Sequence, residues 1–248
     1  GVTGGDADSR SIREMERQER ELWRAADVVL YPSEDEAARV RELEPGVDAR
    51  AITAYAYERF VSDAVPESRE GILFVAGFAH PPNVDAAAWL VRDIMPLVWR
   101  EEPGARLTLV GANPTADVLA LAGAQVEVTG FVSDAELERR YASARVAVVP
   151  LRFGAGVKSK VVEALQQGLP LVTTSTGAQG LDGLADVARV ADDPARIAAG
   201  IVALLRDDAA WRRASALGAR YAAARFSPAA MGAALLDACG LPQREEGR

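Results

Sequence analysis

The sequence has 248 residues, which suit one large α/β domain or two smaller ones, and 49% of them are hydrophobic, enough for a packed core. No segment approaches the length and hydrophobicity of a membrane span, and a net charge of −8 argues against a nucleic-acid partner. The one cysteine, Cys239, excludes an internal disulfide framework, and one histidine without a Cys/His cluster argues against structural zinc.

The lone cysteine also fits a reducing compartment, so we expect the protein to be cytoplasmic. The chain begins Gly-Val-Thr-Gly-Gly-Asp, without Met and without the pattern of a signal peptide. We therefore expect either a piece of a longer protein or the product of an expression vector.

The first quarter of the chain predicts about half of an α/β domain, too little to bury both faces of a sheet alone. The predicted elements are a highly charged helix over 11–26, a strand over 27–31, a helix that ends near Pro45-Gly46 and a strand over 49–53. Ser33 and Glu36 form a capping box that opens the second helix. A polar, irregular stretch over 55–69 follows, and we place the boundary of two domains within it, between 1–66 and 67–248.

After Gly71, strands and helices alternate regularly, which predicts an α/β fold with a doubly wound parallel sheet and right-handed crossovers. The predicted strands cover 72–76, 106–110, 126–129, 146–149, 171–174 and 187–190, and the helices cover 84–100, 115–122, 134–143, 158–167, 194–205, 209–224 and 228–238. Asn83 is predicted to cap the first of these helices, and Ser133 opens a second capping box. Asp193 and Ser227 each precede a proline, the pattern of an N-cap followed by the first helical residue.

Glycine occurs in each loop that follows the first five strands of this predicted sheet. The loops cover 77–83, 111–114, 130–134, 153–156 and 175–181. Because the carboxyl ends of parallel strands meet at one edge of a sheet, the polar groups of these loops are expected to converge there, as a binding cleft requires.

Residues 146–174 form the most informative unit, a strand, a glycine-bearing loop, a helix and a second strand. Gly154 and Gly156 allow a ligand to approach the backbone closely, and the helix offers N–H groups and partial positive charge at its N-terminus. Lys158 and Lys160 place cations in the first helical turn, where the macrodipole favours acids, so a bound phosphate or diphosphate would explain them. The plainer alternative is that both lysines are solvated helix residues.

A set of motifs in a fixed order carries a family resemblance. The motifs are GFAHPPNVD (77–85), LTLVGANP (107–114), VEVTGFVSD (126–134), VAVVPLRFGAGVKSKVVEALQQGLPLVTTSTGAQGL (146–181) and ARFSPAA (224–230). In this order they resemble the carboxyl-terminal, nucleotide-binding domain of a GT-B glycosyltransferase, most similar to glycosyltransferase family 4, the "glycosyl transferases group 1" relatives. The resemblance covers about 71–240, and ADVVLYPSEDEAARV (26–40) is similar to the end of the family's acceptor-binding domain, most of which is missing here.

The resemblance implies a retaining transfer of a sugar from a nucleotide diphosphate sugar to a glycan or other acceptor, as in polysaccharide biosynthesis. We expect no cofactor, and no metal because Lys158 and the helix N-terminus would do its work and no Asp-x-Asp occurs at a sheet-edge loop. The family carries a Glu-x7-Glu pattern across the glycine loop and the helix. Its second glutamate maps to Glu163, which is implied to bond the ribose hydroxyls, whereas Ala155 stands at the position of the first. We expect the backbone N–H groups of Gly154, Ala155, Gly156 and Val157 to replace that first carboxylate.

The family's Arg and Lys in the first-strand loop are also missing, and residues 78–83 stand in their place. Lys158 is then the expected partner of the diphosphate, where the departure of the nucleotide develops negative charge that a cation and a helix N-terminus stabilise. Lys158 and Glu163 are therefore the expected catalytic residues. The other expected substrate contacts are Gly77 and His80 for phosphate or sugar, and Gly130, Phe131 and Val132 for the base.

Other classes of protein stay open at this point. A nucleotide-sugar epimerase of the same fold would need further acid and base residues in the missing domain, and a noncatalytic nucleotide-sugar-binding module would tolerate the loss of the first glutamate. A dinucleotide dehydrogenase is disfavoured because no Gly-x-Gly-x-x-Gly follows the first strand. Glu163 could also be an exposed helical acid and His80 a loop histidine. We assign any peripheral membrane association to the missing domain.

Overall fold

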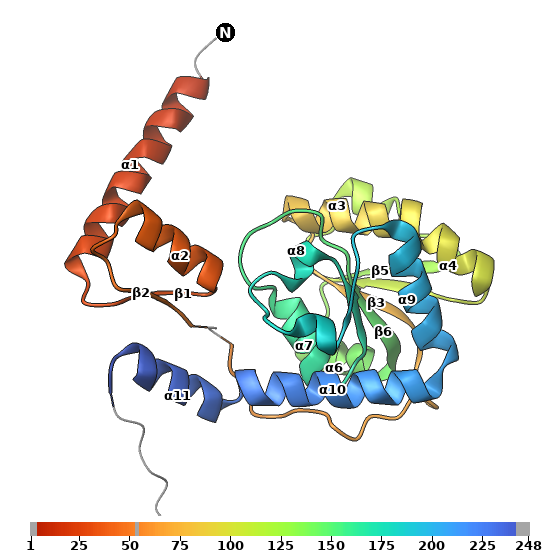
Figure 1. Cartoon of the computed structure of the whole chain (residues 1–248). Helices are drawn as coiled ribbons and strands as arrows, with labels where there is room; N and C mark the ends of the chain where they lie inside the picture. Colours follow the sequence, from red (N-terminus) through yellow and green to blue (C-terminus); the bar gives the residue numbers. More distant parts are fainter. Residues whose placement is uncertain (1–3, 53–54, 242–248) are drawn as a thin grey trace, which may run out of the picture. The chain divides into compact units, whose positions relative to one another are not determined.

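The computed structural model describes residues 4–52 and 55–241, with side chains from residue 12 onward (Figure 1). The Cα atoms fall into two compact units: unit 1 contains residues 1–54 and 229–248, and unit 2 contains residues 55–228. Thr53, the end of a predicted strand, and residues 242–248, the end of the predicted carboxyl-terminal domain, lie outside the described residues.

Unit 1 is built on a two-stranded parallel sheet. Its elements are α1 (Gly4–Ala25), β1 (Val29–Tyr31), α2 (Glu34–Leu43), β2 (Ala49–Ala51) and nearly all of α11 (Pro228–Ala238). Ser33 is confirmed as the N-cap of α2, because its Oγ accepts from the Glu36 N–H at 3.3 Å, and the same hydroxyl donates to the Glu36 carboxylate at 2.8 Å. The buried apolar residues of this unit form a small core of Trp23, Ala37, Val40 and Ala49.

The boundary between the units follows residue 54, whereas the sequence placed it near residue 66. The segment between these points groups with unit 2 because its backbone is hydrogen-bonded to helices there. The Tyr57 N–H donates to Phe226 O at 2.8 Å, and the Val61 N–H donates to Gln166 O at 2.9 Å. The polar composition of residues 55–66 suggested a linker. Their backbone can still be hydrogen-bonded to unit 2, because backbone hydrogen bonds do not depend on side-chain polarity.

The last helix also departs from the expected division, since the residues from 229 onward group with unit 1. Arg50 on β2 donates from Nη1 to the backbone oxygens of Asp237 and Ala238, both at 2.9 Å. A guanidinium at the C-terminal end of a helix satisfies carbonyls that have no partner within the helix.

Unit 2 holds a six-stranded, fully parallel sheet, as the alternation of strands and helices predicted. The strands are β3 (Glu70–Val75), β4 (Leu107–Val110), β5 (Val126–Gly130), β6 (Ala144–Val149), β7 (Leu171–Thr173) and β8 (Arg189–Val190). Their order is β5-β4-β3-β6-β7-β8, so the chain winds outward from β3 in one direction and then from β6 in the other. The fold is therefore doubly wound, with its change of direction between β3 and β6.

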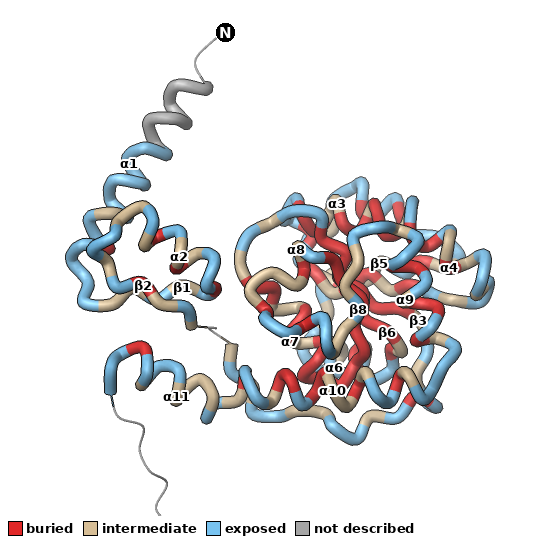
Figure 2. The backbone as a smooth tube through the Cα atoms, in the orientation of Figure 1, coloured by how far each residue is buried: buried red, intermediate tan, exposed pale blue. Residues whose placement is uncertain are grey.

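Helices cover both faces of this sheet. They are α3 (Pro81–Trp89), the π-helical turn η1 (Leu90–Ile94), α4 (Met95–Glu101), α5 (Ala116–Leu119), α6 (Asp134–Ser143), α7 (Ser159–Gln166), α8 (Ser175–Ala178), the 3-10 turn η2 (Leu184–Asp186), α9 (Pro194–Arg206) and α10 (Asp208–Phe226). In Figure 1, α3, α4 and α9 lie on one side of the strands, and α6, α7 and α10 lie on the other. The strands between them are buried (Figure 2), and Phe74, Val148 and Val172 are 0% exposed.

The first helix of unit 2 differs from its prediction in both start and form. It begins at Pro81 with His80 as N-cap, so the predicted capping role of Asn83 is wrong. A proline in the first turn lacks an N–H that would have no helical acceptor anyway, so the two prolines start the helix rather than exclude it. The π-helical turn η1 comes directly before the turn that contains Pro96, a residue that cannot donate to the preceding ladder.

Candidate functional site

The candidate site lies in unit 2 at the carboxyl edge of the sheet, where the winding reverses between β3 and β6. Doubly wound sheets bind their ligands in the crevice at this point. After β3 the chain enters a loop that leads to α3, and after β6 it enters residues 150–158, here called the glycine loop, which lead to α7. A Cβ placed on Gly154 would lie 3.7 Å from the side chain of Pro82, so the two loops approach closely.

The glycine loop is closed by Lys158, the N-cap residue of α7. Gly154 and Gly156 have φ values of 123° and 76°, which side-chain-bearing residues rarely adopt. The Lys158 Nζ donates to the backbone oxygens of Gly154 at 3.2 Å, Ala155 at 3.0 Å and Gly156. An ammonium group has three N–H donors, so these three carbonyls use its hydrogen-bonding capacity. Lys158 is 8% exposed and fixes the shape of the loop from inside.

Lys160 lies two residues further, in the first turn of α7, and its side chain reaches the chain that follows β3. Its Nζ donates to Asn83 Oδ1 at 2.8 Å, and Asn83 Nδ2 donates in turn to Gly77 O at 2.8 Å. Burial lowers the pKa of Lys160 to about 8; the carboxylate of Glu163 acts in the opposite direction and the charge of Lys158 in the same one. A chain of hydrogen bonds therefore joins α7 to the end of β3 through one buried amide.

A second contact joins the glycine loop to α3. The Arg152 Nε donates to Asp85 Oδ2 at 2.8 Å, and a second guanidinium N–H bonds the other carboxylate oxygen. The same guanidinium lies 5.3 Å from the centre of the Trp89 ring. Arg152 is half-exposed and ion-paired, so it braces the glycine loop against α3.

Glu163 lies on α7, three residues after Lys160, beside a hollow between α6 and α7. The Tyr141 hydroxyl donates to Glu163 Oε2 at 3.2 Å, and burial together with that carboxylate holds the pKa of Tyr141 well above its usual range. Burial and the same carboxylate also raise the pKa of Tyr57. The hollow has a volume of about 260 Å³ and is lined by Tyr57, Asp134, Leu137, Glu138, Tyr141, Glu163, Gln166 and Gln167.

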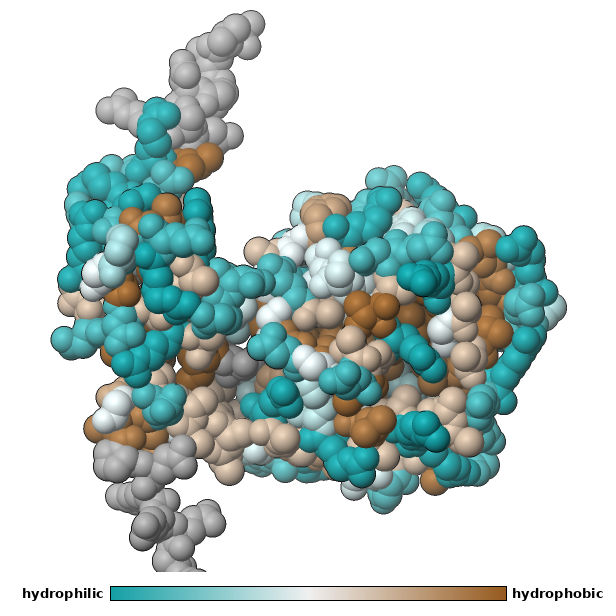
Figure 3. Space-filling view, viewed as in Figure 1, coloured by the Kyte–Doolittle hydropathy of each residue, from teal (hydrophilic) through white to brown (hydrophobic). Residues whose placement is uncertain are grey.

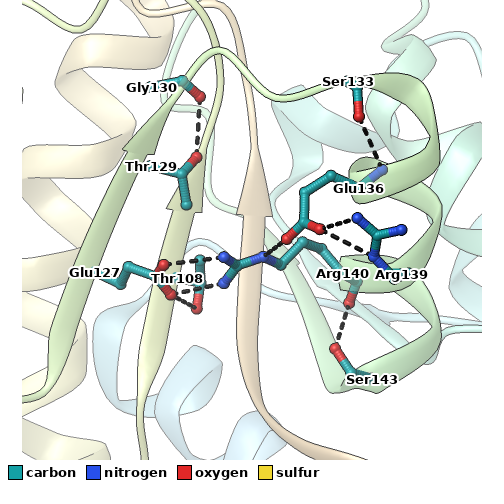
Figure 4. Close-up of polar contacts among 9 residues, drawn as sticks. All are labelled: Thr108, Glu127, Thr129, Gly130, Ser133, Glu136, Arg139, Arg140 and Ser143. Carbon is teal, nitrogen blue, oxygen red and sulfur yellow. Dashed lines mark hydrogen bonds and ion pairs between the residues drawn. The ribbon is translucent and has the colours of Figure 1, made fainter.

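The loop after β5 completes the edge of the site. Gly130 has a φ of 71°, and Ser133 caps α6 by accepting from the Glu136 N–H at 3.3 Å. Figure 4 shows Arg140 of α6 between two carboxylates: it donates to both oxygens of Glu127 at 2.7 and 3.0 Å and to Glu136 at 2.7 Å. This network ties β5 to α6 and so fixes both ends of residues 130–133.

Two aromatic side chains stand out from the loops of this edge. Phe131 is 80% exposed and Phe153 is 49% exposed. On the face shown in Figure 3, hydrophobic residues form small groups among hydrophilic ones. Isolated exposed apolar residues are common on proteins, but these two lie in loops at the carboxyl edge of the sheet, where doubly wound sheets bind ligands.

The structure brings most of the predicted site residues to this edge. Residues 154–157 form the loop around Lys158, and Glu163 follows on α7. Residues 130–132 form the neighbouring loop, Gly77 supplies the carbonyl that Asn83 bonds, and His80 is an exposed N-cap whose side chain makes no capping hydrogen bond. Ala155 is exposed and offers only a methyl group.

Sequence reasoning missed three residues of this edge: Asn83 as a partner of Lys160, and Tyr57 and Tyr141 around Glu163. These partners are far apart in the sequence, and no local pattern marks them. An amide directly after paired prolines, in the place where the resembling family has cations, was the one available signal for Asn83.

Two features are absent from the described ranges, 4–52 and 55–241. These ranges contain no helix long and apolar enough to cross a membrane. Among the same residues, no three or more His, Cys, Asp or Glu side chains are grouped so that they could hold a metal ion.

Solved glycosyltransferase structures share this architecture. S. aureus TarM, solved with fondaparinux, alpha-GlcNAc-glycerol and UDP, matches with a TM-score of 0.71 and 11% identity over 91% of this chain and 46% of TarM. Sucrose-phosphate synthase from Thermosynechococcus elongatus matches at 0.68, with 22% identity over 88% of this chain and 58% of that protein. The pneumococcal O-GlcNAc transferase GtfA, solved with UDP and GlcNAc, matches at 0.62, with 15% identity over 86% of this chain and 44% of GtfA. At these identities the likeness shows the fold, which is that of a GT-B protein with a Rossmann-like domain.

The sequence match is more specific. The glycosyl transferases group 1 family matches residues 69–207, more than half of the chain, and the chain belongs to this family. A 44.6 kDa protein in the cps region of Klebsiella pneumoniae is 30% identical over 116 residues, which are 44% of this chain and 30% of that protein. The chain thus spans less than two thirds of the length of each of these relatives.

Proposed function

We propose that this chain is the donor-binding half of a retaining, cytoplasmic glycosyltransferase of family 4 that moves a sugar from a nucleotide diphosphate sugar to a glycan or other acceptor, as in polysaccharide biosynthesis. The observation that carries the proposal is the meeting of the glycine loop, the N-terminus of α7 and two lysines beside Glu163. Membership of the glycosyl transferases group 1 family supports it, and so does the presence of UDP in the TarM and GtfA structures.

The nucleoside fits the hollow beside Glu163. A carboxylate that already accepts one hydrogen bond from Tyr141 has further lone pairs for the two ribose hydroxyls. The base then lies toward Leu137 and the backbone of residues 130–132, where Phe131 is available as an exposed aromatic face. The sequence led to the expectation that backbone groups of residues 130–132 contact the base, and the exposed Phe131 ring is added to it here.

The diphosphate lies at the glycine loop. When the bond between the anomeric carbon and the diphosphate oxygen breaks, both electrons stay on that oxygen and negative charge develops there. Preorganised N–H groups at the start of α7 and the charge of Lys158 stabilise that charge without a metal ion. Because the Lys158 ammonium is bonded to three loop carbonyls, it acts through charge and through the shape of the loop.

A noncatalytic nucleotide-sugar-binding module is the second candidate, and Ala155 is the observation that favours it. This exposed methyl group stands where the family has a glutamate that contacts the sugar. Binding of donor without turnover by a longer form of the protein would support the module. Turnover would support the enzyme, with backbone N–H groups of the glycine loop in place of the carboxylate.

Binding is tested by a thermal-shift panel of UDP-, GDP-, ADP- and dTDP-sugars on this chain. A ligand that binds only the folded state raises the melting temperature by mass action, so we expect one or two members of the panel to stabilise the protein. Glu163→Gln is expected to weaken that stabilisation, and the matched exposed change Glu138→Gln, at the rim of the same hollow, to weaken it less. A panel without any stabilising member would refute the donor site.

Turnover is tested with this chain and with a longer protein that carries the rest of the acceptor-side domain. Transfer requires both reactants to be held in line, so we expect this chain to bind donor with little or no transfer, and the longer protein to transfer with retained anomeric configuration. Activity should persist in a chelator. Robust transfer by this chain, inversion, or full loss of activity on chelation would each contradict the corresponding part of the proposal.

A further inference from the structure

The sequence contains two lysines, Lys158 and Lys160, and both lie where the glycine loop enters α7. The structure gives their ammonium groups different surroundings. Lys158 is bonded to three carbonyls of its own loop, whereas the recorded hydrogen bond of Lys160 goes to Asn83 Oδ1 at 2.8 Å. One amide oxygen takes one N–H, which leaves two donors of the Lys160 ammonium for a ligand.

Asn83 determines where the Lys160 ammonium lies. Its side chain is 5% exposed, and its Nδ2 is committed to Gly77 O at 2.8 Å, so its Oδ1 must face the lysine. This arrangement holds a cation against the loop after β3, at the point where the sheet reverses direction. The first-strand loop itself, residues 77–83, contains no arginine or lysine.

The cation is partly buried without an ion-pair partner among the described residues. No ion pair among residues 12–52 and 55–241 includes Lys160. The Glu163 carboxylate acts on the Lys160 ammonium through electrostatic attraction without a direct contact. Burial of an ammonium against a neutral amide is unfavourable, and this lowers the pKa of Lys160 to about 8. An anion at the same place would offset that cost.

We propose that Lys160, positioned by Asn83, is the residue that donates hydrogen bonds directly to the diphosphate of the donor, while Lys158 shapes the loop. This rests on the proposed donor site and assigns its diphosphate contact to a residue outside the first-strand loop. In the transfer step the Lys160 N–H groups bond the phosphate oxygens on which the electrons of the broken bond remain. Lys160 then binds the diphosphate of the donor in the ground state. In the transition state its positive charge stabilises the negative charge that develops on the leaving phosphate.

The small number of lysines makes a direct measurement available. Protein labelled with 13C at the lysine ε-carbon gives signals from two side chains, which Lys160→Arg assigns by removing one of them. We expect UDP, GDP, ADP or dTDP, whichever binds, to shift the Lys160 signal strongly, and the matching nucleoside to leave it nearly unchanged. The Lys158 signal should respond less, because its ammonium stays on the loop carbonyls.

Variants give the second readout, by calorimetric titration with the same four diphosphates and their nucleosides. Lys160→Met should weaken the diphosphate at least roughly tenfold and leave the nucleoside within about twofold, because a charge-assisted hydrogen bond is lost. Lys160→Arg should retain part of the affinity. Arg92→Met is the matched control: it removes one positive charge from an exposed position on η1 and should change neither affinity.

The outcomes separate the two proposals. If the wild type binds none of the four diphosphates, the donor site and this inference both fall. If the wild type binds a diphosphate but the Lys160 signal does not move, or Lys160→Met binds it as tightly as Arg92→Met, the inference alone is overturned. Should Lys160→Met fail to fold, the signal of the wild type and the affinity of Lys160→Arg still decide the question.

Discussion

Lys160 shows how burial turns one ionisable group into a source of pH dependence. Its pKa is lowered to about 8 in the folded protein, whereas an unperturbed lysine titrates near 10.4. Between these two values the unfolded chain binds more protons at this position than the folded chain does. The free energy of unfolding therefore rises with pH across this window, because the cost of burying the charged form is present below about pH 8 and disappears above it.

The predicted rise of the free energy of unfolding with pH can be checked by urea unfolding of the wild type and Lys160→Met at pH 7, 8, 9 and 10. Relative to the variant, the wild type should gain stability between pH 8 and 10, by something on the order of 2 kcal/mol. Ionisable groups that the substitution leaves in place are common to both proteins, so the difference isolates Lys160. A difference that is flat with pH, or that falls, would show that Lys160 is not charged at a cost in the folded state.

At the scale of elements, the edge of the site depends on short turns whose geometry comes from single contacts. The turn α8 follows β7, and Thr174 caps it by accepting from the Gly177 N–H at 3.0 Å. A Cβ on Gly177 would lie 2.0 Å from Thr173 Oγ1 and 3.1 Å from Val149 O. Glycine is required at this position because α8 packs directly on the ends of β6 and β7.

We therefore expect Gly177→Ala to destabilise unit 2 by about 1–3 kcal/mol, the usual cost of overpacking a close contact. Gly104→Ala is the matched control, since no atom lies within 4 Å of its added Cβ, and it should change stability by less than about 0.5 kcal/mol. Chemical denaturation of both variants and of the wild type measures the changes in the free energy of unfolding. Equal stability of the two would mean that α8 shifts at little cost to accommodate a methyl group.

For the whole molecule, the strands of unit 2 and their parallel orientation could be predicted from the sequence. The alternation of strands with helices and the glycines that end the strands are local patterns. The position of Asn83 could not be predicted, since its role depends on Lys160, 77 residues away. The shape of the glycine loop was predictable from its glycines, but the inward turn of Lys158 was not, because a first-turn lysine can bond either a ligand or its own loop. The turn α8 could not be predicted either, because four residues are too few to show a helical period in their hydrophobicity.

The unit boundary leads to a prediction about fragments. Residues 55–66 contribute to unit 2 through the Tyr57 and Val61 N–H groups, and the side chain of Gln166 donates to the backbone of Arg59. We expect a fragment of residues 55–228 to unfold cooperatively when heated. A fragment of residues 67–228 should melt at least several degrees lower or without a sharp transition, because these backbone and amide partners on α7 and α10 are lost.

Circular dichroism during heating compares the two fragments. The full chain serves as the reference for the secondary structure and midpoint expected of unit 2. Equal midpoints would show that residues 55–66 add contacts without adding stability, and would favour the boundary near residue 66.

The confinement of lysine to one place has a consequence for proteolysis. An endoprotease specific for lysine can cut this sequence only after Lys158 and Lys160, at the mouth of α7. A protease needs an extended stretch of several residues, so the folded chain must first release the glycine loop and pull the Lys158 ammonium from its carbonyls. The rate of cleavage therefore reports how often this loop opens. A ligand that binds the closed loop should slow the cut without slowing the cleavage of an unfolded lysine peptide, so a gel with that control can screen for ligands without a label or an assay of turnover.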